Sequence, residues 1–275
     1  MPRSRKPRTD LAGNRSRKRL LASRRLGAVR SSAAPPSCTV LITGFGPFPG
    51  APFNPTQALV RRLARRRRPA LAEVARLVHV FATSYASVDR DLPRLIARHR
   101  PDVLLMFGLA SRTPFLRIET RARNAVSRLT PDVAGRIRGA ARIRPGEAAT
   151  LPGRAPFQRL LRAARTARLP ARLSHNAGAY LCNYTYWRGS ETAPGRWPIP
   201  VVAFVHVPLV RRVARPQASR RATTLTDLAR AGEAILLALV AAARCRPVAG
   251  MERQRNAGSR IALRSIRATA ARRRR

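Results

Sequence analysis

The sequence predicts an α/β fold: a single three-layer α/β/α domain with a largely parallel or mixed central sheet. Strand-length apolar runs alternate with amphipathic helical stretches between residues 38 and 110. This alternation favours parallel strands, because each helix carries the chain back to the same edge of the sheet. The chain has 275 residues, 45% of them hydrophobic, which is enough for one domain with a substantial core.

The first predicted strand is the apolar run over residues 38–43, which a glycine ends. A Gly/Pro-rich loop over residues 44–50 follows, and we expect its phenylalanines, Phe45 and Phe48, to be exposed. An asparagine followed by a proline then opens an amphipathic helix over residues 55–67, since these are the preferred cap and first-turn residues.

The remaining helices are predicted from apolar residues that recur every three to four positions, and the remaining strands from short apolar runs. Residues 111–156 are less regular. A glycine-containing turn precedes the helix that is expected to carry Cys182. The predicted strands are 73–83, 103–107, 116–119 and 199–207, and the predicted helices are 86–99, 156–168, 178–187 and 224–243.

The two ends of the chain are predicted to be disordered, basic tails. Residues 1–37 carry eleven basic residues against Asp10 alone, and residues 246–275 carry ten arginines against Glu252 alone. Residues 38–245 lie between them and are the expected catalytic domain. The formal net charge is +44, so this central domain is basic as well.

The excess of basic over acidic residues leaves one alternative function open. It favours nucleic acid or another polyanion as a partner. However, the sequence has no zinc finger, no RRM-like aromatic motif and no obvious helix-turn-helix, and all but two of its 56 basic residues are arginine. We therefore prefer incidental basicity from biased base composition, and keep a polyanion-binding protein as the alternative.

Cysteine and histidine spacing indicates neither disulfides nor a metal site. The cysteines Cys38, Cys182 and Cys245 are odd in number and widely separated, which favours a reducing, cytoplasmic location. Four scattered histidines give no metal-ligand spacing, and no Walker loop or GxGxxG motif is present, so no cofactor is expected. No apolar run reaches the length of a membrane span, and no apolar signal segment follows the basic start.

Cys182 is the candidate nucleophile. A lone cysteine is more often a buried structural thiol. Here Gly178 permits a tight backbone, and the expected helix puts Cys182 in its first turns. Unpaired N–H groups there favour a thiolate and can act as oxyanion donors.

A histidine and an acid complete the candidate site. His206 ends a strand-like run, where a structural role is equally compatible, and His79, His99 and His175 compete with it. Glu119 lies at the edge of an apolar run in a chain with few acids. It could form a weak surface ion pair with a neighbouring arginine, or it could orient the imidazole.

Four segments in order make the chain similar to the pyroglutamyl-peptidase I family of cysteine peptidases. The order Glu, Cys, His resembles that of the family, with intervals here of 63 and 24 residues. The segments are Leu41 to Phe48 with Asn54-Pro55-Thr56, Glu119 to Asn124, Ala177 to Asn183, and Phe204 to Pro208.

The resemblance implies hydrolysis of N-terminal pyroglutamyl residues from peptides through an acyl-enzyme. By the same resemblance, Cys182 attacks the carbonyl, His206 transfers protons and Glu119 orients His206. It also implies no cofactor, no membrane partner and a homotetramer.

The resemblance further implies an apolar site for the lactam ring, lined by Phe45, Phe48, Thr83, Tyr180 and Leu181. Aromatic walls suit a neutral lactam, which offers no charge to bind. One departure stands out: many relatives have glutamine where this chain has Leu109, so substrate preference or activity can differ.

Overall fold

The computed structural model of the protein describes residues 36–48, 51–192, 196–210 and 223–245. Six strands form one sheet in the order β2-β1-β3-β8-β4-β7. All neighbouring strands are parallel except β4 and β8, which run antiparallel. The strands are β1 (Cys38–Phe45), β2 (Val74–Phe81), β3 (Val103–Leu109), β4 (Leu116–Glu119), β7 (Ala171–Ser174) and β8 (Val201–Val207).

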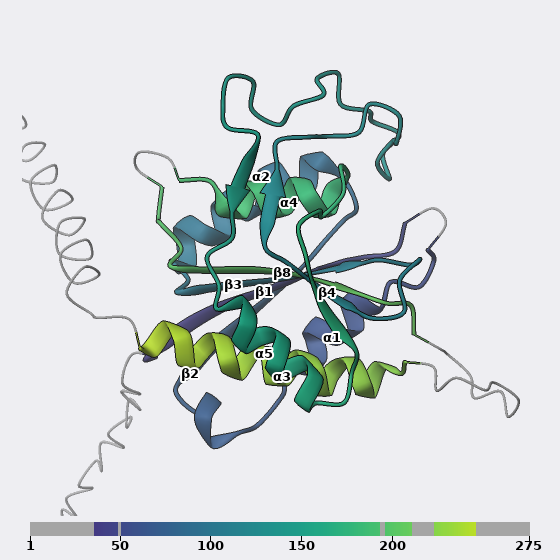
Figure 1. Cartoon of the computed structure of the whole chain (residues 1–275). Coiled ribbons are helices and arrows are strands. Elements are labelled where there is room, and N and C mark those ends of the chain that lie inside the picture. The colour runs from purple at the N-terminus through teal and green to yellow at the C-terminus, as the bar shows by residue number, and fades with distance from the viewer. Residues whose placement is uncertain (1–35, 49–50, 193–195, 211–222, 246–275) are drawn as a thin grey trace, which may run out of the picture. The chain divides into compact units, whose positions relative to one another are not determined.

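Helices cover both faces of this sheet, so the predicted three-layer α/β/α architecture is confirmed (Figure 1). One face carries α1, α3 and α5, and the other carries α2 and α4. The helices are α1 (Pro55–Ala64), α2 (Tyr85–His99), α3 (Phe157–Thr166), α4 (Leu181–Ser190) and α5 (Leu225–Arg244), with a short 3-10 helix at Pro69–Leu71. Two short strands, β5 (Arg121–Arg123) and β6 (Thr150–Pro152), form a separate antiparallel pair.

The helix starts follow from their capping residues. The Asn54 side chain accepts a hydrogen bond from the Thr56 N–H at the start of α1. At the start of α5, Thr224 and Asp227 form a reciprocal capping box. Helix α1 ends at residue 64, earlier than predicted, because its last buried apolar side chain is Leu63 and the four residues after Ala64 are all arginine.

The alternation of side chains along each strand divides the core into two layers. In β8, Val205 packs on the side of α1, α3 and α5, whereas Phe204 packs on the side of α2 and α4. In β4, Ile118 belongs to the first layer. The same alternation turns His206 and Glu119 toward α4, so two residues far apart in sequence share one face of the sheet.

The sequence prediction was wrong about some details. Phe45 is not an exposed loop residue: it ends β1, is buried and packs on Phe81 with ring centroids 5.8 Å apart. Strands β5, β6 and β7 were not predicted, because segments of three or four residues seldom stand out in the sequence; β4 is equally short, but two large apolar residues alternate there with charged ones. The two predicted tails lie outside the described residues, apart from residues 36 and 37. In the described part, no helix is both long and apolar enough to cross a bilayer.

Candidate active site

Cys182 is the second residue of α4, close to where the sequence predicted it. The chain enters this helix through Gly178, whose φ of +85° favours glycine, and through Tyr180 in an extended conformation. No side chain of the described residues caps this helix start. The first N–H groups of a helix have no acceptor within it, so those beside Cys182 can receive an anionic oxygen.

Gly108 of β3 lies directly beneath the Cys182 sulfur. A Cβ atom added at Gly108 would come within 2.7 Å of Sγ and within 2.8 Å of the Phe204 ring. Gly108 also pairs with His206 in the register of β3 and β8. The missing side chain therefore lets the start of α4 approach the sheet beside His206.

The imidazole of His206 is held by Glu119 at its Nδ1 atom. Nδ1 lies 2.8 Å from Oε1 of Glu119, and both side chains are buried. Glu119 is opposite Phe204 in the antiparallel register of β4 and β8, so it reaches His206 diagonally on the same face. An ionised carboxylate can only accept hydrogen bonds, so the hydrogen between Glu119 and His206 is carried by Nδ1 of the ring. The other ring nitrogen, Nε2, is then available to exchange a proton with Cys182.

The electrostatics favour a charged His206–Glu119 pair. Burial disfavours a charged ring, but the Cys182 thiolate and the bond to Glu119 outweigh it and raise the pKa of His206 to about 9. Burial likewise opposes ionisation of Glu119, yet the bonds from His206 and Ser174 and the charge of Arg117 lower the pKa of Glu119 below its usual value. The site therefore favours the imidazolium form of His206 beside an ionised Glu119.

The backbone of Glu119 is fixed as well. The Tyr186 hydroxyl, from the buried side of α4, donates to the Glu119 carbonyl oxygen at 2.9 Å. Gly153 makes room for this contact, since a Cβ there would lie 2.2 Å from the Tyr186 hydroxyl oxygen. The helix that carries the cysteine thus also positions the strand that carries the acid.

The residues predicted to bind the lactam lie at the ends of several elements. Phe45 and Leu181 are buried in the core layer against which Tyr180 and Cys182 pack. Thr83 is buried and its hydroxyl lies 3.3 Å from the Gly46 carbonyl oxygen, in the loop after β1. Phe48 is half-buried and bridges back to Ala51 in the same loop, outside that core layer.

The segment after Glu119 is attached to α4 through two asparagines. Asn183, next to Cys182, accepts from the Arg123 N–H and donates to the carbonyl oxygens of Arg123 and Ala125. Asn124 donates to the carbonyl oxygens of Arg144, Glu147 and Ala148 and accepts from the Arg144 N–H. The sequence carried this signal, because both asparagines belong to the segments of the family resemblance, but their partners could not be foreseen.

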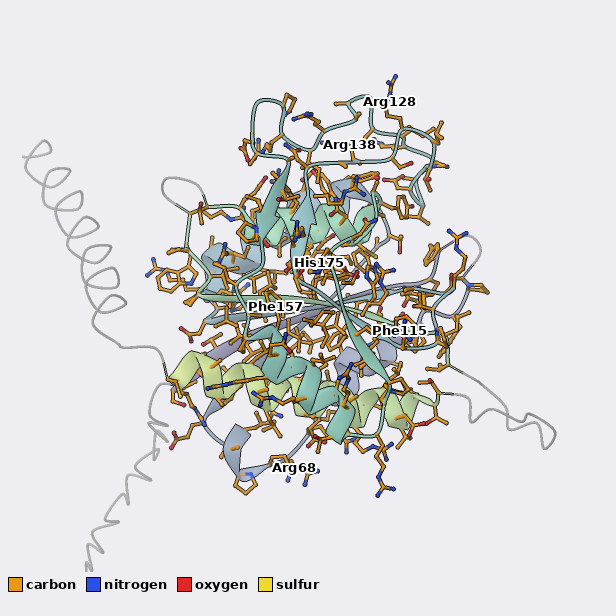
Figure 2. The ribbon with its side chains drawn as sticks, viewed as in Figure 1. Arg68, Phe115, Arg128, Arg138, Phe157 and His175 are labelled. Atoms are coloured by element: carbon orange, nitrogen blue, oxygen red, sulfur yellow. The ribbon has the colours of Figure 1, made fainter. Side chains whose placement is uncertain are left out.

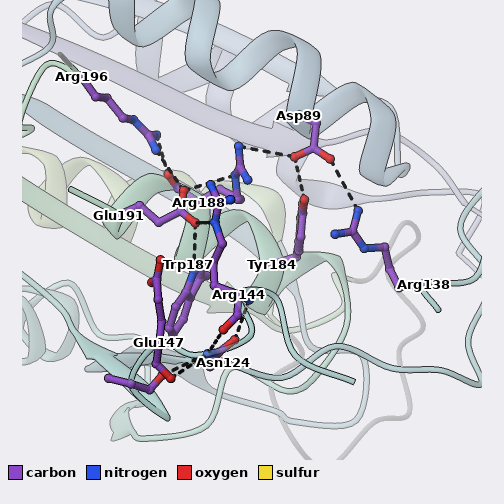
Figure 3. Close-up of polar contacts among 11 residues, drawn as sticks. Asp89, Asn124, Arg138, Arg144, Glu147, Tyr184, Trp187, Arg188, Glu191 and Arg196 are labelled. Carbon is purple, nitrogen blue, oxygen red and sulfur yellow. Dashed lines mark hydrogen bonds and ion pairs between the residues drawn. The ribbon is translucent and has the colours of Figure 1, made fainter. Parts of the chain in front are cut away.

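The far end of α4 is held by buried ion pairs (Figure 3). Glu191 accepts from the Trp187 indole at 3.0 Å and lies within 3.4 Å of Arg144, Arg188 and Arg196. Nearer the middle of the helix, Asp89 of α2 accepts from the Tyr184 hydroxyl at 2.6 Å. These contacts fix the helix whose first turn presents Cys182.

The competing histidines lie elsewhere. His79 is 3.3 Å from Asp91, on the α2 side of β2. His99 ends α2, and the exposed His175 contacts the Thr120 hydroxyl. Sequence reasoning missed the roles of Gly108 and Tyr186, because these depend on contacts between separate strands and a helix. It named Arg117, with Arg121 and Arg123, as a possible surface ion-pair partner of Glu119, and the structure shows that Arg117 forms this pair with the buried carboxylate. Among the described residues, no group of three or more His, Cys, Asp or Glu could hold a metal ion.

Comparison with known proteins gives a consistent result. The sequence model of the family described as pyroglutamyl peptidase matches residues 38–244. The chain is 32% identical over 202 residues to a pyrrolidone-carboxylate peptidase of Gloeobacter violaceus, covering 72% of this chain and 94% of the relative. The corresponding protein of Thermococcus kodakarensis is 30% identical over 189 residues, covering 68% and 89%.

Solved structures show the same similarity. The pyrrolidone carboxyl peptidase of Thermus thermophilus superposes with a TM-score of 0.61 at 30% identity, covering 73% of this chain and 100% of that structure. Pyroglutamyl peptidase I of Bacillus amyloliquefaciens superposes with a TM-score of 0.65 at 24% identity, covering 74% and 97%. The second of these supports the fold alone.

Proposed function

Because the chain belongs to the pyroglutamyl peptidase family, we propose that it hydrolyses N-terminal pyroglutamyl residues from peptides through Cys182, His206 and Glu119. The family consists of cysteine hydrolases, and this chain is one of them. The observation that carries the residue assignment is the buried Glu119–His206 hydrogen bond beside the sulfur that lies over Gly108.

The proposed reaction has two steps. The Cys182 thiolate attacks the pyroglutamyl carbonyl carbon, and the imidazolium of His206 gives its proton to the departing amine nitrogen. Neutral His206 then takes a proton from water while the hydroxide attacks the thioester carbonyl carbon. The C–S bond breaks and expels the Cys182 thiolate with the acid product, and His206 keeps the proton, which restores the thiolate–imidazolium pair. In both steps the N–H groups at the start of α4 stabilise the oxyanion, and Glu119 holds the ring.

Recognition of the lactam is proposed to rest on apolar contact and backbone hydrogen bonds. Phe45, Phe48, Thr83, Tyr180 and Leu181 are the residues that we assign to it. The shared core layer of Phe45, Tyr180, Leu181 and Cys182 supports this assignment. A pyroglutamyl ring carries no charge, so shape and desolvation must supply most of the selectivity.

The alternative of a polyanion-binding protein has no support from the comparisons. Arg68 and Arg128 lie at opposite ends of the described part of the chain, so these two arginines do not belong to one basic surface (Figure 2). Nucleic-acid binders concentrate basic groups on one surface.

The cellular setting and assembly are proposals as well. Cys38, Cys182 and Cys245 are all free thiols. Reducing compartments keep thiols free of disulfides, and on this ground we assign the enzyme to the cytoplasm. We also propose a homotetramer by analogy with the family, which sedimentation velocity at two protein concentrations would test.

The decisive experiment is release of a fluorogenic amine from a pyroglutamyl substrate by the wild type and by Cys182→Ala. We expect turnover only in the wild type, with the exposed-thiol variant Cys245→Ala as the active control. The prolyl analogue, which lacks the lactam carbonyl, should be cleaved far more slowly. If the wild type releases no more amine than Cys182→Ala, the proposed function is wrong.

A further inference from the structure

Arg117 contacts the carboxylate that holds His206. It lies two residues before Glu119 on β4, so its side chain is on the same face of the sheet. Its Nη2 atom is 3.0 Å from Oε1 of Glu119, the same oxygen that accepts from His206 Nδ1. In the register of β4 and β8, Arg117 is directly opposite His206.

The same guanidinium nitrogen also reaches the segment that leads to the cysteine. Nη2 lies 3.1 Å from the Ser174 hydroxyl at the end of β7, and it donates to the Asn176 carbonyl oxygen. Asn176 stands six residues before Cys182 in the connection between β7 and α4. One cation therefore links the acid to the loop that presents the sulfur.

We propose that Arg117 is a positioning residue of the peptidase reaction, which keeps Glu119 ionised and oriented while His206 changes its charge and ties both to the Cys182 loop. This inference rests on the proposed function. It assigns no contact with the substrate to Arg117.

The reaction requires such a permanent cation. After His206 has protonated the leaving amine, its ring is neutral, and the fully buried Glu119 loses its charged partner. A buried carboxylate without a counter-charge is unfavourable and tends to take up a proton. An arginine remains charged at every relevant pH, so Arg117 compensates Glu119 throughout the cycle.

The charged groups around His206 give the sign of the pH effect. Glu119 and Arg117 face it from β4 and Cys182 faces it from α4, whereas its β3 neighbours Gly108 and Leu109 carry no charge. Loss of the Arg117 cation makes ring protonation easier and also makes protonation of Glu119 easier. Both changes move the acidic limb of the kcat–pH profile to higher pH, because the second step requires a neutral His206 and an ionised Glu119.

The test compares kcat–pH profiles of the wild type, Arg117→Gln and Arg117→Lys. We expect Arg117→Gln to shift the acidic limb upward by about half a pH unit or more and to lower kcat about tenfold. Arg117→Lys keeps the charge, so its limb should stay at the wild-type position. Its kcat should still fall about threefold, because the lysine ammonium cannot take the exact place of the guanidinium nitrogen Nη2, which makes all three contacts.

Arg121→Gln is the matched control, since Arg121 is an exposed arginine on the adjacent β5 and should leave rate and profile unchanged. The inference is overturned if Arg117→Gln keeps the wild-type limb, or if Arg117→Lys shifts it as far as glutamine does. If Arg117→Gln does not fold, Arg117→Lys decides the question. A wild-type kcat in Arg117→Lys, or a shift of its acidic limb, would contradict the inference.

A second readout separates this inference from the proposed function. NMR titration of the His206 ring should give a higher pKa in Arg117→Gln than in the wild type, with no substrate present. Absence of wild-type turnover would contradict the proposed function alone. An unchanged ring titration would contradict the inference alone.

Discussion

His206 and Glu119 form a buried hydrogen-bonded pair, with Nδ1 2.8 Å from Oε1, although 87 residues separate them in the sequence. The pair exists because β4 runs antiparallel to β8 and places both side chains on the face that α4 covers. Since Cys182 lies in the first turn of α4, the fold brings Glu119, His206 and Cys182 to the same side of the sheet.

Replacing the acid by its amide tests the role of this pair. Glu119→Gln keeps the shape of the side chain but removes the charge that favours the imidazolium and the required tautomer. We expect kcat/KM to fall about ten-thousandfold, by analogy with the serine-protease acid. Glu147→Gln, at an exposed position, is the control and should retain full activity in the same fluorogenic assay. Activity within a few-fold of wild type in Glu119→Gln would refute the orienting role.

Gly108 is predicted to accept no side chain. In Gly108→Ala, the new Cβ would lie within 2.7 Å of the Cys182 sulfur, so sulfur and Phe204 must move. We expect kcat to fall about a hundredfold, because small displacements of reacting groups are costly. Gly139→Ala is the matched control, since nothing lies within 4 Å of its Cβ. Equal kinetics for the two variants would mean that the close approach is irrelevant.

The raised pKa of His206 predicts a loss of stability at alkaline pH. The pKa rises from its ordinary 6.5 to about 9, so the stabilisation is fully present below pH 6.5 and is lost as pH rises through 9. The wild type should therefore lose about 5 °C of Tm between pH 7 and pH 10 beyond the loss in His206→Gln. Calorimetry of the two proteins across that range measures the difference. Parallel Tm curves would show that His206 is not held in its charged form.

The buried ion pairs of Glu191 should matter for stability more than for chemistry. Glu191→Gln leaves Arg196 without its counter-charge in a largely buried site and leaves Arg188 with Asp89 alone, at 3.7 Å. This should cost about 3 kcal/mol of unfolding free energy. kcat should change less than threefold, because Cys182 lies two helical turns away. Urea unfolding of Glu191→Gln, with Glu147→Gln beside it, measures the effect. A change in kcat without a change in the free energy of unfolding would contradict a mainly structural role of Glu191.

Most of the architecture could be predicted because it depends on local patterns. The apolar run of β3 and the Thr224–Asp227 capping box are legible within a few residues. The short strands β5 and β7 could not be predicted, since pairing with distant segments, rather than local propensity, makes them strands. Phe45 was misjudged for the same reason: the pairing of β1 with β2 extends the strand and buries its ring on Phe81.

The sequence by itself determined the residue types and their order: a cysteine after a glycine turn, a histidine at a strand end and a scarce glutamate, in segments that resemble one family. Only the tertiary structure decided which atoms meet. Hydrogen bonds and ion pairs act over a few ångströms, whereas these residues are separated by tens of positions. Only the antiparallel register of β4 and β8 shows that Arg117 and His206 both contact Oε1 of Glu119.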